Sequence, residues 1–480
     1  MKEKSLKRNY LYNVIYKVVN VIIPFITAPY IARVLGADGV GKVSYTESVV
    51  SYFVLFATMG IPIFGQREIS YVQDKTEERS IVFWNTFVLQ FVISLIISLV
   101  YFAFSYIWGG NLYYIFALNI FAVMFDISWF FQGIEEFGKL VLRSILVRIV
   151  NVIFLFCFVK TKNDLTIYAV GIALFPLLGN LSLWKYLRRY INRPTIKNLN
   201  PFGNIKTVLS LFIPTIAIQI YTVFDKTMIG LITKNDFQNG YYEQATKITK
   251  IVISMITAMG AVMIPRVGYY LKNKSNKDVI NLIKKGYNFI WFLGIPVFIG
   301  MIVVAPNFVP WFFGDGYNEV VTLLQILSAL VLAICISNMT GYQYLIPTNQ
   351  QSFLTVSVVV GSIVNFALNL LLIKKYQAVG ASIASVIAEM AVTICQMYLV
   401  RNQLPVWDIL KLSKNYCIAG AIMGLITAII STRIKASIIG TVILVVCGAA
   451  IYFLTLFVMK DSFFVNHIRQ VYCKVKKTIR

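Results

Sequence analysis

Residues 81–107 read IVFWNTFVLQFVISLIISLVYFAFSYI and contain no charged side chain. A helix needs about 20 consecutive, mostly apolar residues to cross the hydrocarbon core of a bilayer, and this run is longer. Only helices and closed barrels satisfy all of their backbone hydrogen bonds in hydrocarbon, and a long unbroken apolar run is typical of a helix. The segment therefore predicts a transmembrane helix.

The rest of the chain repeats this pattern. It has 480 residues, of which 58% are hydrophobic and 13% charged, with a mean hydropathy of +0.73. Soluble proteins average about 25% charged residues. Counting outward from residues 81–107 gives about 14 apolar runs, which predict an all-α membrane protein with about 14 transmembrane helices. The runs are 11–33, 41–64, 81–107, 112–132, 144–160, 166–187, 207–232, 241–264, 286–305, 318–344, 353–373, 378–400, 416–432 and 436–459.

Basic residues gather on one side of the predicted membrane. With the N-terminus placed in the cytoplasm, the cytoplasmic connections hold about 29 Lys and Arg against about 9 on the opposite side. An even number of helices returns the C-terminus to the cytoplasm, where the tail 474–480 is basic. The net charge of +24 is thus a topology signal, and no nucleic-acid partner is expected. The sequence predicts a multi-pass membrane protein with both termini cytoplasmic.

An internal repeat is visible along the chain. Ala57-Thr-Met-Gly60 matches Thr257-Ala-Met-Gly260, and Ile149-Val-Asn151 matches Ile363-Val-Asn365. The offsets are roughly 200–214 residues, so helices 1–6 correspond to helices 7–12. Six helices is an even number, which predicts repeats that run in the same direction, with the substrate between them. The predicted segments are 1–200 (helices 1–6), 201–405 (helices 7–12), and 406–480 (helices 13 and 14 with the basic tail).

Charged residues within the apolar runs mark a candidate site. Each costs about 2.5–3.5 kcal/mol at a helix centre, so such side chains normally face a wet cavity or a partner. The basic candidates are Lys17, Arg148, Lys226 and Lys247, and the acidic ones are Glu47, Asp126, Asp225, Glu243 and Glu389. One central polar cavity would accommodate them all. Pairing between helices is the alternative for Lys17, Glu47, Asp126 and Arg148. A pair within one helix at i,i+4 is the alternative for Lys247 with Glu243.

Prolines within the runs are hinge candidates. Pro24 and Pro29 lie in the first run, and Pro214 lies in the corresponding seventh run. Proline removes a helix hydrogen bond and permits bending. Bends at matching places in both repeats suit a conformational cycle, whereas tolerated kinks are the plainer alternative.

The sequence lacks the residues that most membrane enzymes need. His467 is the only histidine, and the six cysteines form no CxxC pair, so no metal site or disulfide framework is expected. No Walker motif is present, which argues against direct use of ATP. Connections on the non-cytoplasmic side are short, as in Trp108-Gly-Gly-Asn111. We expect no enzyme activity and no cofactor.

Three segments carry a resemblance to a known family. Gly41-Lys-Val-Ser-Tyr-Thr-Glu-Ser48 has its counterpart in Gly240-Tyr-Tyr-Glu-Gln-Ala-Thr-Lys-Ile248, and Asp126-Ile-Ser-Trp-Phe-Phe-Gln-Gly-Ile-Glu-Glu-Phe137 leaves the fourth run. With these segments, its length and its repeat, the chain resembles the Wzx-type polysaccharide repeat-unit flippases of the multidrug/oligosaccharidyl-lipid/polysaccharide (MOP) superfamily. The resemblance implies a V-shaped, MATE-like bundle of two six-helix lobes plus two C-terminal helices.

The resemblance also implies a function. The expected substrate is an undecaprenyl-diphosphate-linked oligosaccharide, moved by alternating access from the cytoplasmic to the outer leaflet for O-antigen, capsule or cell-wall polysaccharide. The four basic candidates would then contact the diphosphate, and the five acidic ones would be cavity partners or ion-coupling groups. A polysaccharide polymerase and glycosyltransferases are the implied protein partners. Coupling to H+, Na+, the membrane potential or downhill exchange stays open.

Other functions are compatible with the same sequence. A peptidoglycan-precursor (lipid II) flippase shares the 14 helices. A MATE-type drug/cation antiporter usually has 12 helices and an acidic cavity, so the extra helices and basic candidates argue against it. An integral-membrane polymerase, ligase or glycosyltransferase is disfavoured by the short external connections and the single histidine.

Overall fold

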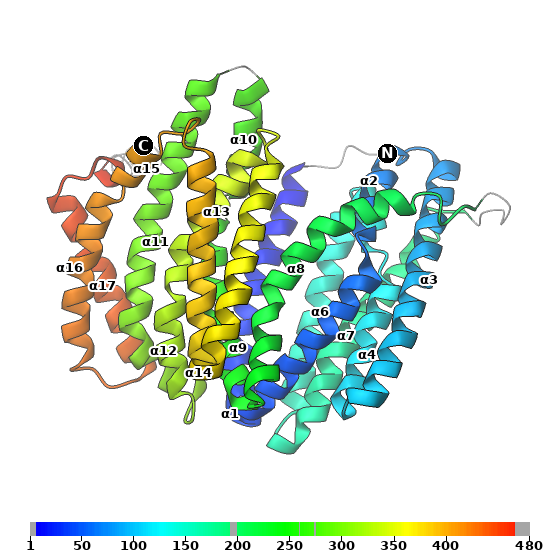
Figure 1. Ribbon diagram of the computed structural model, residues 1–480, viewed down its shortest axis with the longest axis horizontal. Coiled ribbons are helices and arrows are strands. Elements are labelled where there is room, and N and C mark those ends of the chain that lie inside the picture. The colour runs from blue at the N-terminus through cyan, green and yellow to red at the C-terminus, as the bar shows by residue number, and fades with distance from the viewer. Residues whose placement is uncertain (1–5, 193–198, 259, 273–274, 466–480) are drawn as a thin grey trace, which may run out of the picture. The chain divides into compact units, whose positions relative to one another are not determined.

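The computed structural model describes residues 6–192, 199–258, 260–272 and 275–465, and within them the regular elements are helices (Figure 1). The elements in chain order are α1 (Leu6–Thr58), α2 (Ile61–Tyr71), α3 (Thr76–Trp108), α4 (Asn111–Met124), α5 (Ser128–Gly133), α6 (Phe137–Phe158), the 3-10 turn η1 (Lys162–Asp164), α7 (Leu165–Leu187), α8 (Ile205–Thr233), α9 (Asp236–Thr257), α10 (Gly260–Lys272), α11 (Asn276–Phe313), α12 (Asn318–Leu327), α13 (Ala329–Thr340), the π-helical turn η3 (Gly341–Leu345), α14 (Gln351–Leu399), α15 (Val406–Lys411), α16 (Lys414–Ser431) and α17 (Ile438–Val458).

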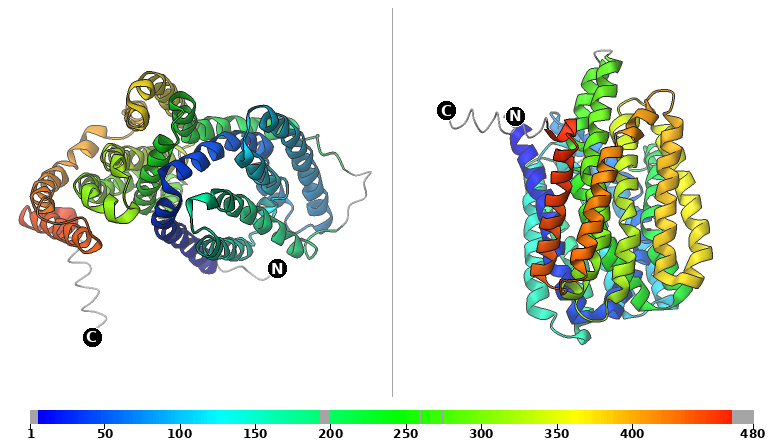
Figure 2. Two further views of the ribbon diagram at one scale, coloured as in Figure 1. Left: turned by 90° about the horizontal axis from the view of Figure 1, so that it is seen from below. Right: turned by 90° about the vertical axis from the view of Figure 1, so that its left-hand side faces the viewer.

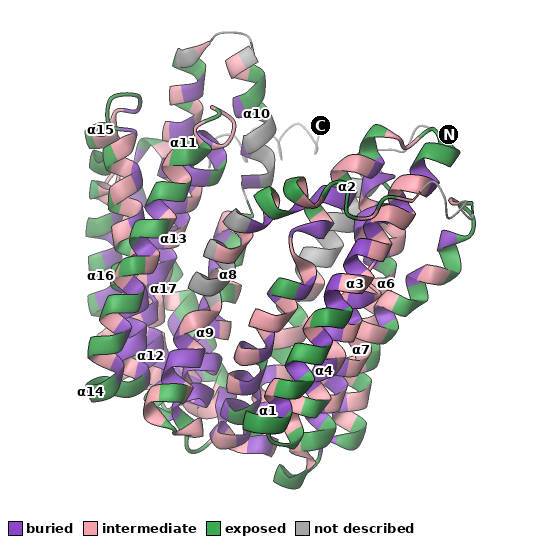
Figure 3. Cartoon of the chain, turned by 45° about the vertical axis from the view of Figure 1, so that its right-hand side comes forward, coloured by how far each residue is buried: buried purple, intermediate pink, exposed green. Residues whose placement is uncertain are grey.

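Ten helical segments of the described chain are long and apolar enough to cross a membrane. The charge-free run 81–107 lies within one of them, α3. Large apolar side chains cover the outside of these helices, including Leu425 and Ile439, which are 69% and 73% exposed. Figure 3 shows exposed residues along the outward sides of α16. An outer surface of this kind is stable in lipid, where apolar side chains need no burial, and the predicted all-α membrane fold is confirmed.

Two of the ten spans change direction at a single residue. The backbone is non-helical at Gly36 in α1 (φ 70°, ψ 172°) and at Gln377 in α14 (φ 52°, ψ −128°). Both residues lie in connections that the sequence places between apolar runs. Each of these two spans therefore holds two predicted runs, so the ten spans account for twelve of the fourteen. The other two runs, 207–232 and 241–264, fall on α8 and on α9 with α10.

The chain forms two compact units, Met1–Gly240 and Tyr241–Arg480. In the first unit α4 packs against α1, α3 and α7, while α8 packs against α1 and α2. In the second unit α11 contacts α13, α16 and α17, and α13 contacts α14. Figure 2 shows the helices of each unit end on and from the side. The division into segments 1–200, 201–405 and 406–480 stays a prediction.

A clamp of aromatic and amide side chains divides the predicted run 112–132. Gln90 of α3 donates from Nε2 to the carbonyl oxygens of Val123 and Asp126, which ends α4 at Met124. The indole N–H of Trp129 in α5 donates to Oε1 of Gln90 at 3.0 Å. Trp129 is fully buried, with its ring 5.5 Å from that of Phe83. The segment that carried the family resemblance is thus a packing core of the first unit.

Two glycines allow a backbone-to-backbone helix crossing within the first unit. A Cβ atom on Gly41 would overlap the carbonyl oxygen of Asp236, and a Cβ atom on Gly240 would overlap the carbonyl oxygen of Ala37. Gly41 lies four residues after Ala37, and Gly240 lies four residues after Asp236. The two glycines are counterparts in the predicted repeat, so the crossing is reciprocal. Close approach of this kind is the main use of glycine at helix contacts in membranes.

Adding a methyl group at either glycine will test this crossing. Gly41→Ala or Gly240→Ala forces the two backbones apart, because no side-chain rotation can relieve an overlap with a carbonyl oxygen. Overpacking typically costs about 1–3 kcal/mol. We expect a lower midpoint of thermal unfolding in detergent for each variant.

Gly300→Ala in α11 is the matched control, since a Cβ atom there would meet nothing within 4 Å. Its midpoint should stay the same or rise slightly, because alanine favours helix over glycine. An unchanged midpoint for both Gly41→Ala and Gly240→Ala would contradict the described crossing.

Candidate functional site

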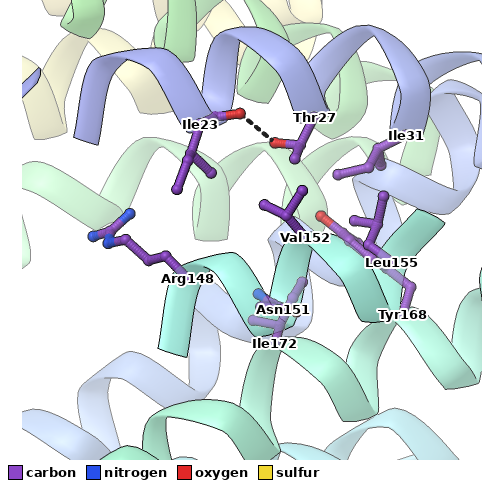
Figure 4. A pocket seen from close by; sticks show the side chains of 9 residues that line it. All are labelled: Ile23, Thr27, Ile31, Arg148, Asn151, Val152, Leu155, Tyr168 and Ile172. Atoms are coloured by element: carbon purple, nitrogen blue, oxygen red, sulfur yellow. Dashed lines mark hydrogen bonds between the residues drawn. The ribbon is translucent and has the colours of Figure 1, made fainter. Parts of the chain in front are cut away.

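A cavity of about 130 Å³ lies among α1, α6 and α7 in the first unit, and the close-up in Figure 4 shows its lining side chains. Apolar residues supply most of the wall, and four polar side chains interrupt it. The lining residues are Ile23, Thr27, Ile31, Arg148, Asn151, Val152, Leu155, Tyr168 and Ile172. A polar cavity of this size has room for several water molecules. It is a partly polar niche within helices that are apolar on their exposed sides.

Helical spacing explains how α6 presents Arg148 to this cavity. Arg148, Asn151 and Leu155 follow one another at intervals of three and four residues, which places them on one face of the helix. Figure 4 shows Arg148 at one end of the cavity, beside Ile23 of α1. A guanidinium in a partly dry site attracts anions far more strongly than in water and can bind a phosphate through two parallel hydrogen bonds. The predicted basic site residue thus lies in a cavity suited to an anion.

A second arginine on the same helix has a different role. Arg143 donates from Nη1 to Oδ1 of Asn180 in α7, and Asn180 donates from Nδ2 to the carbonyl oxygen of Ala122 in α4 at 2.6 Å. Arg143 therefore ties α6 to its neighbours through a chain of hydrogen bonds. The contrast shows that the position on α6 decides whether an arginine serves packing or faces the cavity.

The Lys247 and Glu243 candidates form an ion pair. Their Nζ and Oε1 atoms are 3.1 Å apart at the i,i+4 spacing of α9. The Glu243 side chain is 9% exposed and that of Lys247 is 34% exposed. Truncating Lys247 would leave a buried carboxylate without this partner, which is costly. The sequence alternative of pairing within one helix is confirmed, and a role in binding or coupling stays a prediction.

The polar residues of the predicted run 41–64 differ in their exposure and contacts. Ser48 and Tyr52 of α1 each place a hydroxyl oxygen 3.0 Å from Oγ1 of Thr227 in α8, and all three oxygens share one cluster. Glu47 lies beside Ser48 in the chain but is exposed. On α8, Asp225 is buried and Lys226 is half-buried, two residues and one residue before Thr227. The cluster joins α1 and α8 where two acidic candidates lie nearby in the sequence.

The remaining acidic candidates lie elsewhere. Asp126 sits in the break between α4 and α5, where its Oδ1 accepts a hydrogen bond from the backbone N–H of Ser128 at 2.8 Å. Its carboxylate thus forms an Asx turn that leads into α5. Glu389 is half-buried in α14, and its carbonyl oxygen accepts from Oγ1 of Thr393 at 2.8 Å. That these residues share one chamber with Arg148 stays a prediction.

The basic candidates and the proline hinge candidates each include one residue whose side chain the structure does not describe. Lys17 lies on α1, but its side chain is outside the described part of the chain, as is that of Pro214 on α8. Pro24 and Pro29 are inside α1, where the non-helical backbone is at Gly36. The bend of α1 is therefore placed at the glycine, and hinge motion at the three prolines stays a prediction.

Sequence reasoning missed Thr27 and Tyr168 in the cavity. Thr27 lies seven residues after Asn20, two helical turns along α1, so the polar face that begins at Lys17 and Asn20 could have been extended to it. Tyr168 carries no such signal, because a tyrosine at the start of a transmembrane helix more often anchors it at the interface. Within the described residues, no group of three or more His, Cys, Asp or Glu side chains could hold a metal ion.

Comparison with known proteins places the chain among membrane transporters. A family model described as "Polysaccharide biosynthesis protein" matches residues 6–271. A protein of Escherichia coli (strain K12) named "Putative O-antigen transporter" is 24% identical over 406 residues, which cover 83% of this chain and 97% of that protein.

Two solved structures share the fold. "Lipid II flippase MurJ, inward closed conformation" aligns with a TM-score of 0.73 at 16% identity, covering 96% of this chain and 99% of that one. An inward-facing multidrug resistance MATE family transporter of the MOP superfamily aligns with a TM-score of 0.60 at 15% identity, covering 82% of this chain and 99% of that one. At these identities the likeness concerns the fold, and it confirms the MATE-like architecture.

Thiol labelling will test whether the Arg148 cavity holds water. In a variant without native cysteines, Asn151→Cys should react with a charged, membrane-impermeant thiosulfonate in vesicles open to the reagent on both faces. Leu99→Cys on α3 is the control, because Leu99 is 65% exposed on an apolar surface that lipid would cover. We expect at least about tenfold faster labelling at position 151, since thiolate forms readily only in contact with water. Equal rates would place Asn151 in a dry environment.

Proposed function

The chain belongs to the polysaccharide biosynthesis protein family, and from that premise we propose that it moves an undecaprenyl-diphosphate-linked oligosaccharide from the cytoplasmic to the outer leaflet of a bacterial inner membrane. Its resemblance to the Wzx-type flippases of the MOP superfamily is confirmed by the family match and by the shared fold. The protein is a multi-pass membrane protein with ten candidate spans in its described residues. The proposed product is a repeat unit for O-antigen, capsule or cell-wall polysaccharide.

The observation that supports this proposal most directly is the half-buried Arg148 at a partly polar cavity between apolar helices. A diphosphate headgroup carries negative charge that cannot enter hydrocarbon alone. A guanidinium inside the protein offsets that cost through charge-assisted hydrogen bonds, which are worth about 1.5–3 kcal/mol each. The prenyl tail can stay in lipid, because the outer helices are apolar on their exposed sides.

Alternating access is the proposed mechanism. One set of residues that binds the headgroup opens first to one leaflet and then to the other, and no covalent bond changes. We propose no enzyme activity, cytoplasmic N- and C-termini, and delivery of the substrate from membrane glycosyltransferases to a polymerase. The acidic candidates Glu47, Asp126, Asp225, Glu243 and Glu389 are proposed as cavity or ion-coupling groups. The proposed driving force is H+, Na+, the membrane potential or downhill exchange.

A lipid II flippase is the second candidate, favoured by the fold shared over 96% of the chain. Both functions need an anion site for a prenyl-linked diphosphate. They differ in the glycan and in the consequence of losing the gene. A strain that survives deletion but loses its surface polysaccharide fits the first function, whereas loss of viability with accumulated peptidoglycan precursor fits the second.

Removing the proposed anion site should block export. We expect Lys17→Ala combined with Arg148→Ala to lower surface polysaccharide by about tenfold or more in a deletion strain, because each lost charge-assisted hydrogen bond costs about 1.5–3 kcal/mol. Lipid-linked repeat units should accumulate on the cytoplasmic side. The measurements are polysaccharide on the cell surface and lipid-linked glycan in membrane extracts.

The matched control is Lys160→Ala, which removes an exposed cation from the connection between α6 and α7. Its export should match the wild type at equal protein abundance in the membrane. Normal export by the Lys17/Arg148 double variant would remove these residues from the headgroup site. Arg148→Lys should restore part of the export, because lysine keeps the charge without the planar fork.

A further inference from the structure

A second cavity lies at the far end of α7, where that helix meets the beginning of α3. Its volume is about 840 Å³, and it is lined by Trp84, Trp184, Lys185, Leu187, Arg188, Ile191 and Asn192. Ile172, which lines the Arg148 cavity, precedes Trp184 by twelve residues on the same helix, or about 18 Å along its axis. The two cavities are therefore separate sites.

Two cations face this cavity without an acidic partner. Lys185 and Arg188 are exposed and lie three residues apart on one face of the helix end. Within the described residues, neither side chain forms an ion pair or a hydrogen bond. Both are held at a cavity of mixed polar and apolar character, which leaves their charge available to an anion.

Two nearby cations, Arg79 and Lys139, are already used by the fold. Arg79 donates from Nε and Nη2 to the carbonyl oxygen of Tyr190, at 3.1 and 2.6 Å. Lys139 lies 4.3 Å from the centre of the Tyr190 ring and 3.7 Å from Oε2 of Glu136. These contacts fix the segment after α7 against α3 and α6. Among the basic residues that the structure describes around this helix end, Lys185 and Arg188 are the two that line the cavity.

The aromatic walls of the cavity are held in place. Trp84 donates from Nε1 to the carbonyl oxygen of Asn192 at 3.2 Å, and Trp184 donates from Nε1 to that of Phe125 at 3.0 Å. Phe87 packs against Trp184, with ring centres 4.6 Å apart. With both indole N–H groups bonded, the rings offer their apolar surfaces. The cavity is thus preformed, which lowers the entropic cost of binding.

The position of this cavity matches the depth of lipid headgroups. The apolar span of α7 ends at Leu187, and that of α3 begins at Thr76. Tryptophan is enriched at this level of the membrane, and basic clusters just beyond the apolar span attract anionic lipids of the cytoplasmic leaflet. Residues 188–206 belong to the basic side that the charge distribution predicts to be cytoplasmic.

We infer that this cavity binds one anionic phospholipid of the surrounding bilayer. Lys185 and Arg188 hold the phosphodiester, and Trp184, Leu187 and Ile191 contact the first segments of the acyl chains. The charge of the site favours a phosphatidylglycerol-like headgroup over a zwitterionic one, because a zwitterion brings its own cation close to the two basic side chains. This site differs from the one proposed for the transported substrate.

Native mass spectrometry of the purified full-length protein will test the inference, with dioleoyl phosphatidylglycerol or dioleoyl phosphatidylcholine added to the detergent micelles. We expect one tightly retained phosphatidylglycerol on the wild type and weak retention of phosphatidylcholine. Lys185→Gln combined with Arg188→Gln should weaken phosphatidylglycerol binding by about tenfold or more, since each cation near a membrane surface contributes about 1 kcal/mol.

Arg189→Gln is the matched control, because Arg189 is an adjacent exposed cation that does not line the cavity. It should bind phosphatidylglycerol as the wild type does. Equal retention by the double variant at an unchanged unfolding midpoint would overturn the inference, as would equal binding of the two lipids by the wild type. A prenyl diphosphate is the third ligand to test. If it displaces phosphatidylglycerol at a concentration lower than the one at which phosphatidylglycerol itself binds, the inference is overturned and the cavity is assigned to the transported lipid.

Discussion

Backbone hydrogen bonding in the absence of water is the constraint on which this structure depends. Each peptide group in hydrocarbon must find its partner within the chain, which leaves helices as the form of a span this apolar. Once the helices exist, lipid removes the need to hide apolar side chains, and it penalises polar ones instead. The protein accordingly has apolar side chains both in its core and on its outer surface, while serine, threonine, asparagine and glutamine are buried at helix contacts. The cluster of Ser48, Tyr52 and Thr227 is one such contact.

The same penalty separates structural from functional charges. A charge can be held by a neighbouring helix, as Arg143 is by Asn180, or by its own helix, as Lys247 is by Glu243. A charge can also line a cavity between helices, as Arg148 does. A cavity gives a ligand room to approach the charged group, which close packing between helices does not. The position of Arg148 at a cavity, and not the number of intramembrane charges, is therefore what supports the proposed function.

Most of the fold could be predicted from hydropathy, because the apolar runs are long and their separators are short. The bend at Gly36 could be placed, because this glycine lies in the short connection between the first two apolar runs. Glycine readily adopts the positive φ that the backbone has there. The break at Asp126 could not be predicted, because it depends on Gln90, which reaches across from another helix. In the site, spacing placed Arg148 and Asn151 on one face but missed Tyr168, whose contribution comes from a third helix. Periodicity along the sequence predicts which residues share one face of a helix. Which side chains of other helices lie against that face depends on packing, which the sequence alone does not give.

The reciprocal crossing at Gly41 and Gly240 fixes the alignment of two helices. Each glycine accommodates a carbonyl oxygen four residues before the other. A peptide carbonyl has no rotamers, so the separation of the two backbones at this point is set by covalent geometry, and no neighbouring side chain can rearrange to compensate for an added methyl group. Within the first unit, sliding of α1 along the first turn of α9 would move each glycine out from under its carbonyl oxygen and bring a bulkier residue into the contact.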